Sequence, residues 1–90
     1  MGVNNSKIFT KVLSGTSLLI ISNYGLRSVS VVLVSGTGSV TGDLLVDGLT
    51  NDPIPLVVGQ SVTVSVEGSQ ILDGLTVNAT SGVINIIAKH

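Results

Sequence analysis

Alternation of apolar and polar residues runs through much of this chain and predicts β-strands. In residues 60–67 three valines, Val62, Val64 and Val66, alternate with serine and threonine. Because successive side chains of a strand point to opposite faces, this pattern predicts a strand in a sheet with one solvated face. A charge in such an apolar row would be buried without a partner, so Val64→Asp is expected to abolish folding.

Similar patterns recur at near-regular spacing. Further strands are expected at residues 7–14, 17–23, 27–35, 39–46, 75–79 and 82–89, with residues 53–55 at an edge or corner because two prolines cannot both donate to a central ladder. Glycine recurs about every eight residues and leaves no window for a stable helix. We therefore predict an all-β fold, a single compact β-sandwich or small jelly roll of about eight short antiparallel strands over residues 7–90, preceded by a polar N-terminal arm at residues 1–6.

Residues 27–35 are expected to form the longest strand. Val29, Val31 and Leu33 would share one face, and the C-terminal half of the strand is expected to be buried on both sides. The glycine-containing segments 15–16, 36–38 and 80–82 are expected to turn the chain between strands, with residues 36–42 as a glycine-rich hairpin and 80–82 as a tight hairpin.

One short pattern occurs twice. Residues 45–50 and 71–76 both read aliphatic-aliphatic-Asp-Gly-Leu-Thr, and Asp-Gly is a turn dipeptide. We interpret the two copies as equivalent strand–turn–strand corners in the two halves of the sandwich. The alternative is that the two aspartates act as ligands.

Composition leaves few residues for chemistry. Val, Ile and Thr account for 31 of the 90 residues, with no Cys, one Glu (Glu67) and one His (His90). A nucleophile needs a base within hydrogen-bond reach, and His90 is the last residue, where chains commonly fray. The sequence therefore predicts a protein that is not an enzyme and uses no cofactor or transition metal.

Charged residues are sparse and indicate contacts with protein. They make up 10% of the chain, with a net charge of −1, against about a quarter in an ordinary domain. Much of the surface is therefore expected to face other subunits, in a homo-oligomer. Four scattered basic residues give no footprint for nucleic acid, and no apolar run reaches the length of a membrane span. The apolar stretch 12–21 is interrupted and lacks a cleavage site, so we expect synthesis in the cytoplasm without a signal peptide.

Two sets of residues are candidates for binding. Asp43, Asp47 and Asp52 lie within ten residues on loop-like backbone and are candidate calcium ligands, although their spacing matches no EF-hand and solvated turn aspartates are the alternative. Tyr24 and Arg27 belong to an expected turn, and both residue types dominate protein interfaces. They are candidate interface residues, with a tyrosine that only plugs the end of the sandwich as the alternative. Tyr24→Ala is expected to keep the fold and weaken assembly.

The last 40 residues or so resemble known modules. Residues 54–64 (IPLVVGQSVTV) resemble the apolar-Gly-Gln-Ser-Val-Thr-Val hairpin of bacterial and phage Ig-like or jelly-roll modules. Residues 72–79 and 82–87 are similar to the C-terminal halves of small tailed-bacteriophage virion proteins. The resemblance implies a capsid-decoration, head-fibre-base or head–tail accessory protein, located in the virion, with other virion structural proteins as partners. The alternative is a cell-surface module that binds carbohydrate or protein near residues 43–52, with or without calcium.

Overall fold

Six β-strands and no helix make up residues 6–90, the part of the chain that the computed structural model describes. The strands are β1 (Ile8–Ser22), β2 (Ser28–Ser35), β3 (Ser39–Thr41), β4 (Ile54–Pro55), β5 (Ser61–Ser65) and β6 (Asp73–Lys89). Every pairing between these strands is antiparallel. The predicted all-β class is therefore confirmed. Apart from Ser6, the N-terminal arm predicted at residues 1–6 lies outside the described residues.

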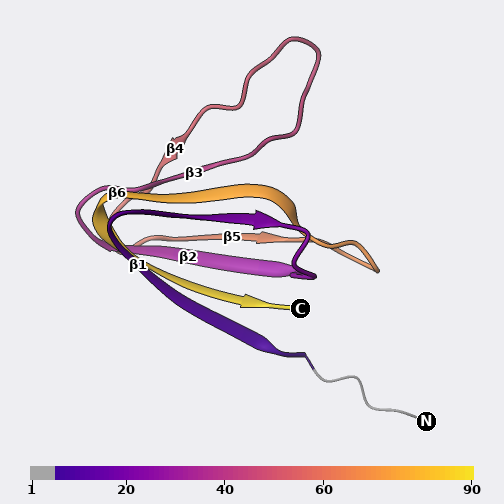
Figure 1. The fold of residues 1–90 in the computed structure, drawn as a ribbon, viewed down its shortest axis with the longest axis horizontal. Coiled ribbons are helices and arrows are strands. Elements are labelled where there is room, and N and C mark those ends of the chain that lie inside the picture. The colour runs from indigo at the N-terminus through magenta and orange to yellow at the C-terminus, as the bar shows by residue number, and fades with distance from the viewer. Residues whose placement is uncertain (1–5) are drawn as a thin grey trace.

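Two long strands determine the shape of the fold (Figure 1). β1 and β6 pair from Ile8↔Lys89 to Ser22↔Asp73, and both bend where Gly15 lies opposite Gly82. The bend folds the sheet into two layers. Layer 1 holds β4, β3, residues 73–79 of β6 and residues 17–22 of β1, and layer 2 holds β5, β2, residues 82–89 of β6 and residues 8–15 of β1.

The prediction of about eight short strands is corrected by this bend. Residues 7–14 and 17–23 form one strand, as do residues 75–79 and 82–89, so six strands supply the two layers. The hairpin predicted at residues 80–82 is wrong, because each half of β6 pairs with β1 rather than with the other half. Glycine at residues 15 and 82 permits a bend as readily as a turn.

The link between β2 and β3 crosses from layer 2 to layer 1. Both strands pair with β6, and neither pairs with the other, so residues 36–42 do not form the predicted hairpin. The strand predicted at residues 39–46 ends at Thr41. β4 pairs with β3 on one side only, which confirms that residues 53–55 contribute an edge.

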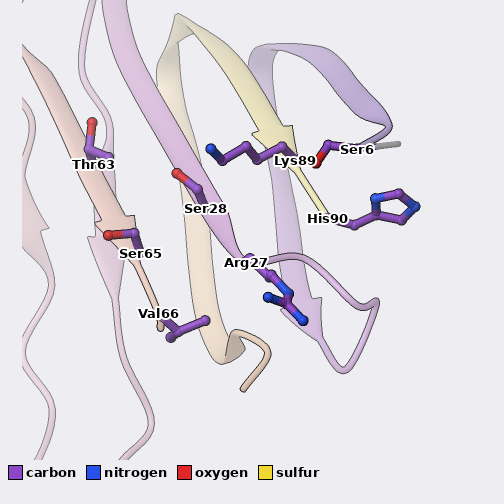
Figure 2. A pocket seen from close by; sticks show the side chains of 8 residues that line it. All are labelled: Ser6, Arg27, Ser28, Thr63, Ser65, Val66, Lys89 and His90. Atoms are coloured by element: carbon purple, nitrogen blue, oxygen red, sulfur yellow. The ribbon is translucent and has the colours of Figure 1, made fainter. Parts of the chain in front are cut away.

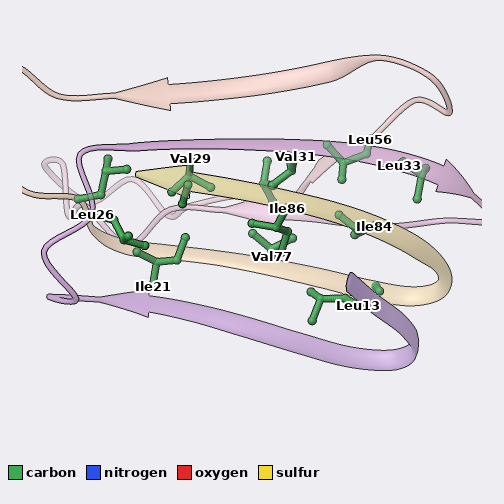
Figure 3. Close-up of a cluster of buried hydrophobic side chains, with 14 residues drawn as sticks. Leu13, Ile21, Leu26, Val29, Val31, Leu33, Leu56, Val77, Ile84 and Ile86 are labelled. Atoms are coloured by element: carbon green, nitrogen blue, oxygen red, sulfur yellow. The ribbon is translucent and has the colours of Figure 1, made fainter. Parts of the chain in front are cut away.

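The core lies between the two layers (Figure 3). It consists of buried aliphatic side chains: Leu13, Ile21, Leu26, Val29, Val31, Leu33, Val40, Leu56, Leu72, Val77, Ala79, Ile84, Ile86 and Ala88. The predicted face of Val29, Val31 and Leu33 is confirmed as buried. The predicted burial of the C-terminal half of β2 on both faces is wrong, because its second face is the outer surface of layer 2, where Val34 is exposed.

β5 is the outer strand of layer 2. It pairs with β2 alone, and its residue Val64 is 36% exposed. The premise that Val64 is buried in the strand interior is therefore wrong, and Val64→Asp is instead expected to fold, since a carboxylate at this edge can reach water. The alternation of β5 is present, but the strand lies beside the core rather than within it.

The two Asp-Gly sites have different structures. Asp47 and Gly48 both have positive φ, 28° and 77°, between the bridged residues Val46 and Leu49, which is the pattern of a type I′ turn. Gly74, with φ of 88°, is instead an extra residue within β6, where the register with β1 shifts. The prediction of equivalent corners is therefore wrong: one site is a loop tip and the other a β-bulge.

Candidate functional site

The most prominent surface feature is a long excursion between β3 and β4, residues 42–53, which we call the projecting arm. Figure 1 shows it extending away from the sheet. Its tip is closed by the turn at Asp47-Gly48, where the Leu49 N–H donates to the Val46 carbonyl at 2.6 Å. Farther down, the Asn51 amide donates to the Leu44 carbonyl at 3.1 Å. These hydrogen bonds join the two sides of the arm and give it a defined shape.

The arm presents leucines to solvent. Leu44 is 76% exposed, Leu45 85% and Leu49 67%, and Val46 beside them is also exposed. Single exposed apolar residues are ordinary, but a contiguous group on a protruding element is typical of an interaction site. The tip of the arm is therefore apolar.

The arm is also acidic. It carries Asp43, Asp47 and Asp52, three of the five acidic residues of the chain, and no basic residue. Within residues 6–90, these aspartates do not come together with other His, Asp or Glu side chains in a group of three that could hold a metal ion. Asp43 lies at the base of the arm, where its carboxylate occupies the space that a Cβ on Gly74 would need.

A cationic groove of about 680 Å³ lies at the open end of the sandwich (Figure 2). The residues that line it are Ser6, Arg27, Ser28, Thr63, Ser65, Val66, Lys89 and His90. Strand pairing brings these residues together, because Ser28 of β2 lies opposite both Lys89 of β6 and Ser65 of β5 on one outer face. The groove therefore combines two cationic side chains with a row of hydroxyl groups.

Arg27 is partly engaged within the fold. Its guanidinium donates to the Gly68 carbonyl, and its backbone N–H donates to the Lys89 carbonyl at 2.7 Å. Its own carbonyl accepts a hydrogen bond from the Val66 N–H at 2.9 Å. These bonds tie the segment after β5 to the start of β2 and leave the rest of the guanidinium at the groove.

A second hollow, of about 440 Å³, opens between the two halves of β1, and we call it the apolar cleft. It is lined by Lys7, Ile8, Phe9, Leu19, Ile21, Tyr24, Leu26 and His90. Pairing with β6 directs Phe9 and Leu19 toward the inner face, because their partners Ala88 and Val77 are buried. The cleft is therefore a continuation of the core that is left open at the β1 edge.

The rim of the apolar cleft joins the two ends of the described chain. The Lys7 N–H donates to Nδ1 of His90 at 3.0 Å, and the His90 N–H donates to the Lys7 carbonyl at 3.2 Å. The expectation that His90 frays is therefore wrong, since backbone and side chain are both paired. Sequence gave no signal for this contact, because the two residues are 83 positions apart.

The structure brings both predicted interface residues to this same end. Tyr24 is 64% exposed and lines the apolar cleft, while Arg27 lines the cationic groove. Their role in an interface stays a prediction. The leucines of the arm and the apolar lining of the cleft were missed, although an unbroken apolar run at residues 44–46 next to Asp-Gly marks an exposed turn.

The interior offers no polar site. Among residues 6–90 no polar or charged side chain is buried, and the core consists of aliphatic side chains. The chemical capacity of the described structure is therefore on its surface, in the arm, the groove and the cleft. Residues 6–90 contain no helix with the length and apolar character needed to span a membrane.

Comparison with known proteins gives information on the fold. No protein-family model and no curated protein matches the chain. Among solved structures, the chain is similar to the crystal structure of an RmlC-like cupin protein from Desulfovibrio desulfuricans, with a TM-score of 0.61 and 19% sequence identity. The match covers 99% of this chain and 74% of that one. At this identity the likeness concerns the fold alone, and it agrees with a small β-sandwich of the jelly-roll kind.

Proposed function

We propose that this protein is a non-enzymatic structural component that works by assembling with other protein subunits. The observation that carries the proposal is the projecting arm, with Leu44, Leu45 and Leu49 all more than half exposed. Burying one such side chain contributes about 1.5–3 kcal/mol. An ordered element that places leucines in water gains this energy only when a partner covers it.

The rest of the surface supports the proposal. Exposed large apolar side chains also occur on β1, including Ile8, Val12, Leu18 and Ile20. Charged residues, which keep monomers soluble, make up only 10% of the chain. Because the interior is aliphatic, assembly with other subunits is the function that best fits the fold.

In its specific form, the proposal is a virion component of the capsid-decoration or head–tail accessory type. The support is the resemblance of residues 72–79 and 82–87 to small tailed-phage virion proteins, and of residues 54–64 to bacterial and phage Ig-like or jelly-roll modules. Its partners would be other virion structural proteins and further copies of itself. Immunogold labelling of particles purified from the source culture tests this form. Labelled particles are expected, and unlabelled particles alongside free protein would contradict it.

Sedimentation velocity of the purified full chain tests the assembly itself. We expect the wild type to sediment as an oligomer at micromolar concentration and Leu44→Ser/Leu45→Ser to sediment as a monomer with an unchanged circular dichroism spectrum. Val57→Ser is the matched control, because Val57 is exposed and apolar but lies outside the arm. A monomeric wild type at all concentrations would contradict the proposal.

The second candidate is a cell-surface module that binds carbohydrate or protein. The cationic groove favours it, because serine and threonine hydroxyls beside Arg27 and Lys89 suit an anionic sugar. A glycan array with wild type and Lys89→Ala tests this candidate. Binding that the substitution removes would support it, as would a calcium-dependent rise in melting temperature, and a blank array would contradict the carbohydrate form.

A further inference from the structure

We infer that the projecting arm of one copy inserts into the apolar cleft of a second copy, so that identical chains join head to tail. This inference rests on the proposed assembly function and names the partner of the arm. Each chain carries both surfaces, so one interface repeated between copies covers both.

The apolar match is between a convex and a concave surface. The arm ends in a narrow turn with Leu44, Leu45 and Leu49 exposed around it. The cleft is a hollow of about 440 Å³ with Phe9 and Leu19 on its walls. Anchor side chains that fill a preformed pocket dominate binding energy at protein interfaces. The tip of the arm supplies the anchor side chains, and the cleft supplies the preformed pocket.

Charge favours the same pairing. The arm holds three aspartates and no base, whereas Lys7 lies at the cleft and Arg27 and Lys89 line the adjoining groove. An acidic arm that approaches a basic rim is attracted to it, and complementary rim charges also fix register. The same acidic arm would be repelled by an anionic membrane surface, which makes a lipid partner the weaker choice for these leucines.

Topology separates the two surfaces within one chain. Residues 76–78 of β6 pair with β3 on one side and with β1 on the other. The arm leaves from the β3 edge, as Figure 1 shows, and the cleft opens at the β1 edge. One copy therefore presents its arm and its cleft on opposite edges. Contacts of this heterologous kind build a closed ring or an open filament.

A symmetrical dimer through the free edge of β1 is less favourable. β1 carries Lys11, and Lys7 directly precedes the strand, so two copies joined edge to edge along β1 would bring four lysines to one seam. Lysines on an edge strand are a common device against edge-to-edge pairing. The head-to-tail contact instead brings Lys7, which lines the apolar cleft, toward the aspartates of the arm.

Complementation between two variants tests the inference. Leu44→Ser/Leu45→Ser removes the arm surface, and Phe9→Ser/Tyr24→Ser removes the cleft surface. Each variant alone is expected to be monomeric at concentrations where the wild type is oligomeric, with association weakened about a hundredfold. An equimolar mixture is expected to form a heterodimer and stop there, because one intact arm meets one intact cleft. Native mass spectrometry resolves these species when one variant is isotope-labelled.

The outcomes separate the inference from the assembly function. A mixture that stays monomeric while the wild type is oligomeric would overturn the head-to-tail contact and leave assembly standing. A monomeric wild type would overturn both. Circular dichroism checks that each variant is folded. If the double cleft variant fails this check, Tyr24→Glu replaces it, since a negative charge at the exposed rim repels the arm without removing an inner side chain.

Discussion

Gly36 and Gly82 allow two backbone segments to touch at the closed end of the sandwich. A Cβ on Gly36 would lie 2.2 Å from the Ser81 carbonyl oxygen, and the Thr37 hydroxyl lies 2.8 Å from that of Thr80. Backbone on both sides leaves no flexible side chain that can move away. The corner between β2 and β3 and the bend of β6 therefore depend on each other.

Gly36→Ala is predicted to destabilise the fold by about 3 kcal/mol or more. Gly15→Ala is the matched control, because both glycines have positive φ, 74° and 67°, but a Cβ on Gly15 meets nothing within 4 Å. The control should cost only the backbone strain of about 1–2 kcal/mol. Urea unfolding measures both, and equal losses would contradict the close-approach argument.

Val29 and Val64 lie opposite each other and test where the core ends. Val29 is 1% exposed, whereas Val64 at the sheet edge is 36% exposed. Val29→Asp is predicted to abolish folding, since the cost of an unpaired buried charge, above about 4 kcal/mol, approaches the stability of a small domain. Val64→Asp should fold with a modest loss, as measured by thermal melting. An unfolded Val64→Asp would place β5 inside the core.

The alternation of apolar and polar residues correctly predicted which face of the sheet a residue occupies. It did not predict whether a strand lies at the centre or at the edge of the sheet. It identified Val29, Val31 and Leu33 as one buried face because period two reports which side of a sheet a residue occupies. It could not show that β5 has a neighbour on one side only. That property depends on which strand pairs with which, and the residues that decide it are far apart in sequence.

At the scale of elements, the bent strands β1 and β6 are the main difference from the sequence prediction. Glycine at residues 15 and 82 marked the places where the chain changes direction. Whether such a place becomes a hairpin or a bend depends on the partner of each half, and here each strand is the other's partner throughout. The apolar cleft forms because β1 bends together with β6, which brings the two halves of β1 face to face. Local sequence patterns do not report this pairing, so the cleft could not be predicted. The arm was not predicted, because residues 42–46 were expected to continue the strand that ends at Thr41.

The segment between β5 and β6 is held against the residues that precede β2. The Arg27 guanidinium donates to the Gly68 carbonyl, and the Leu72 N–H donates to the Leu26 carbonyl. Arg27→Ala removes the first bond and should speed amide hydrogen exchange at residues 67–71 about tenfold, with a small change in melting temperature. Arg27→Lys, which keeps a donor, should have a smaller effect. Unchanged exchange in Arg27→Ala would show that this bond does not hold the segment.

For the whole molecule, charge differs between the projecting arm and the open end of the sandwich. The arm carries three aspartates and no basic residue, whereas the open end carries Lys7, Arg27 and Lys89 together with Glu67 and Asp73. Association should therefore weaken between 50 and 500 mM NaCl, by about tenfold or less, because salt screens rim charges while apolar burial persists. Sedimentation equilibrium measures this dependence. Association that strengthens with salt would indicate an interface without charge complementarity.

Light scattering across a dilution series of the full chain measures directly whether copies of this protein assemble. A monomer has a mass of 9.1 kDa. We expect a multiple of that mass at low micromolar concentration, which falls to 9.1 kDa when Leu44 and Leu45 are replaced by serine. A wild-type mass of 9.1 kDa at every concentration would contradict the claim that the exposed leucines serve assembly.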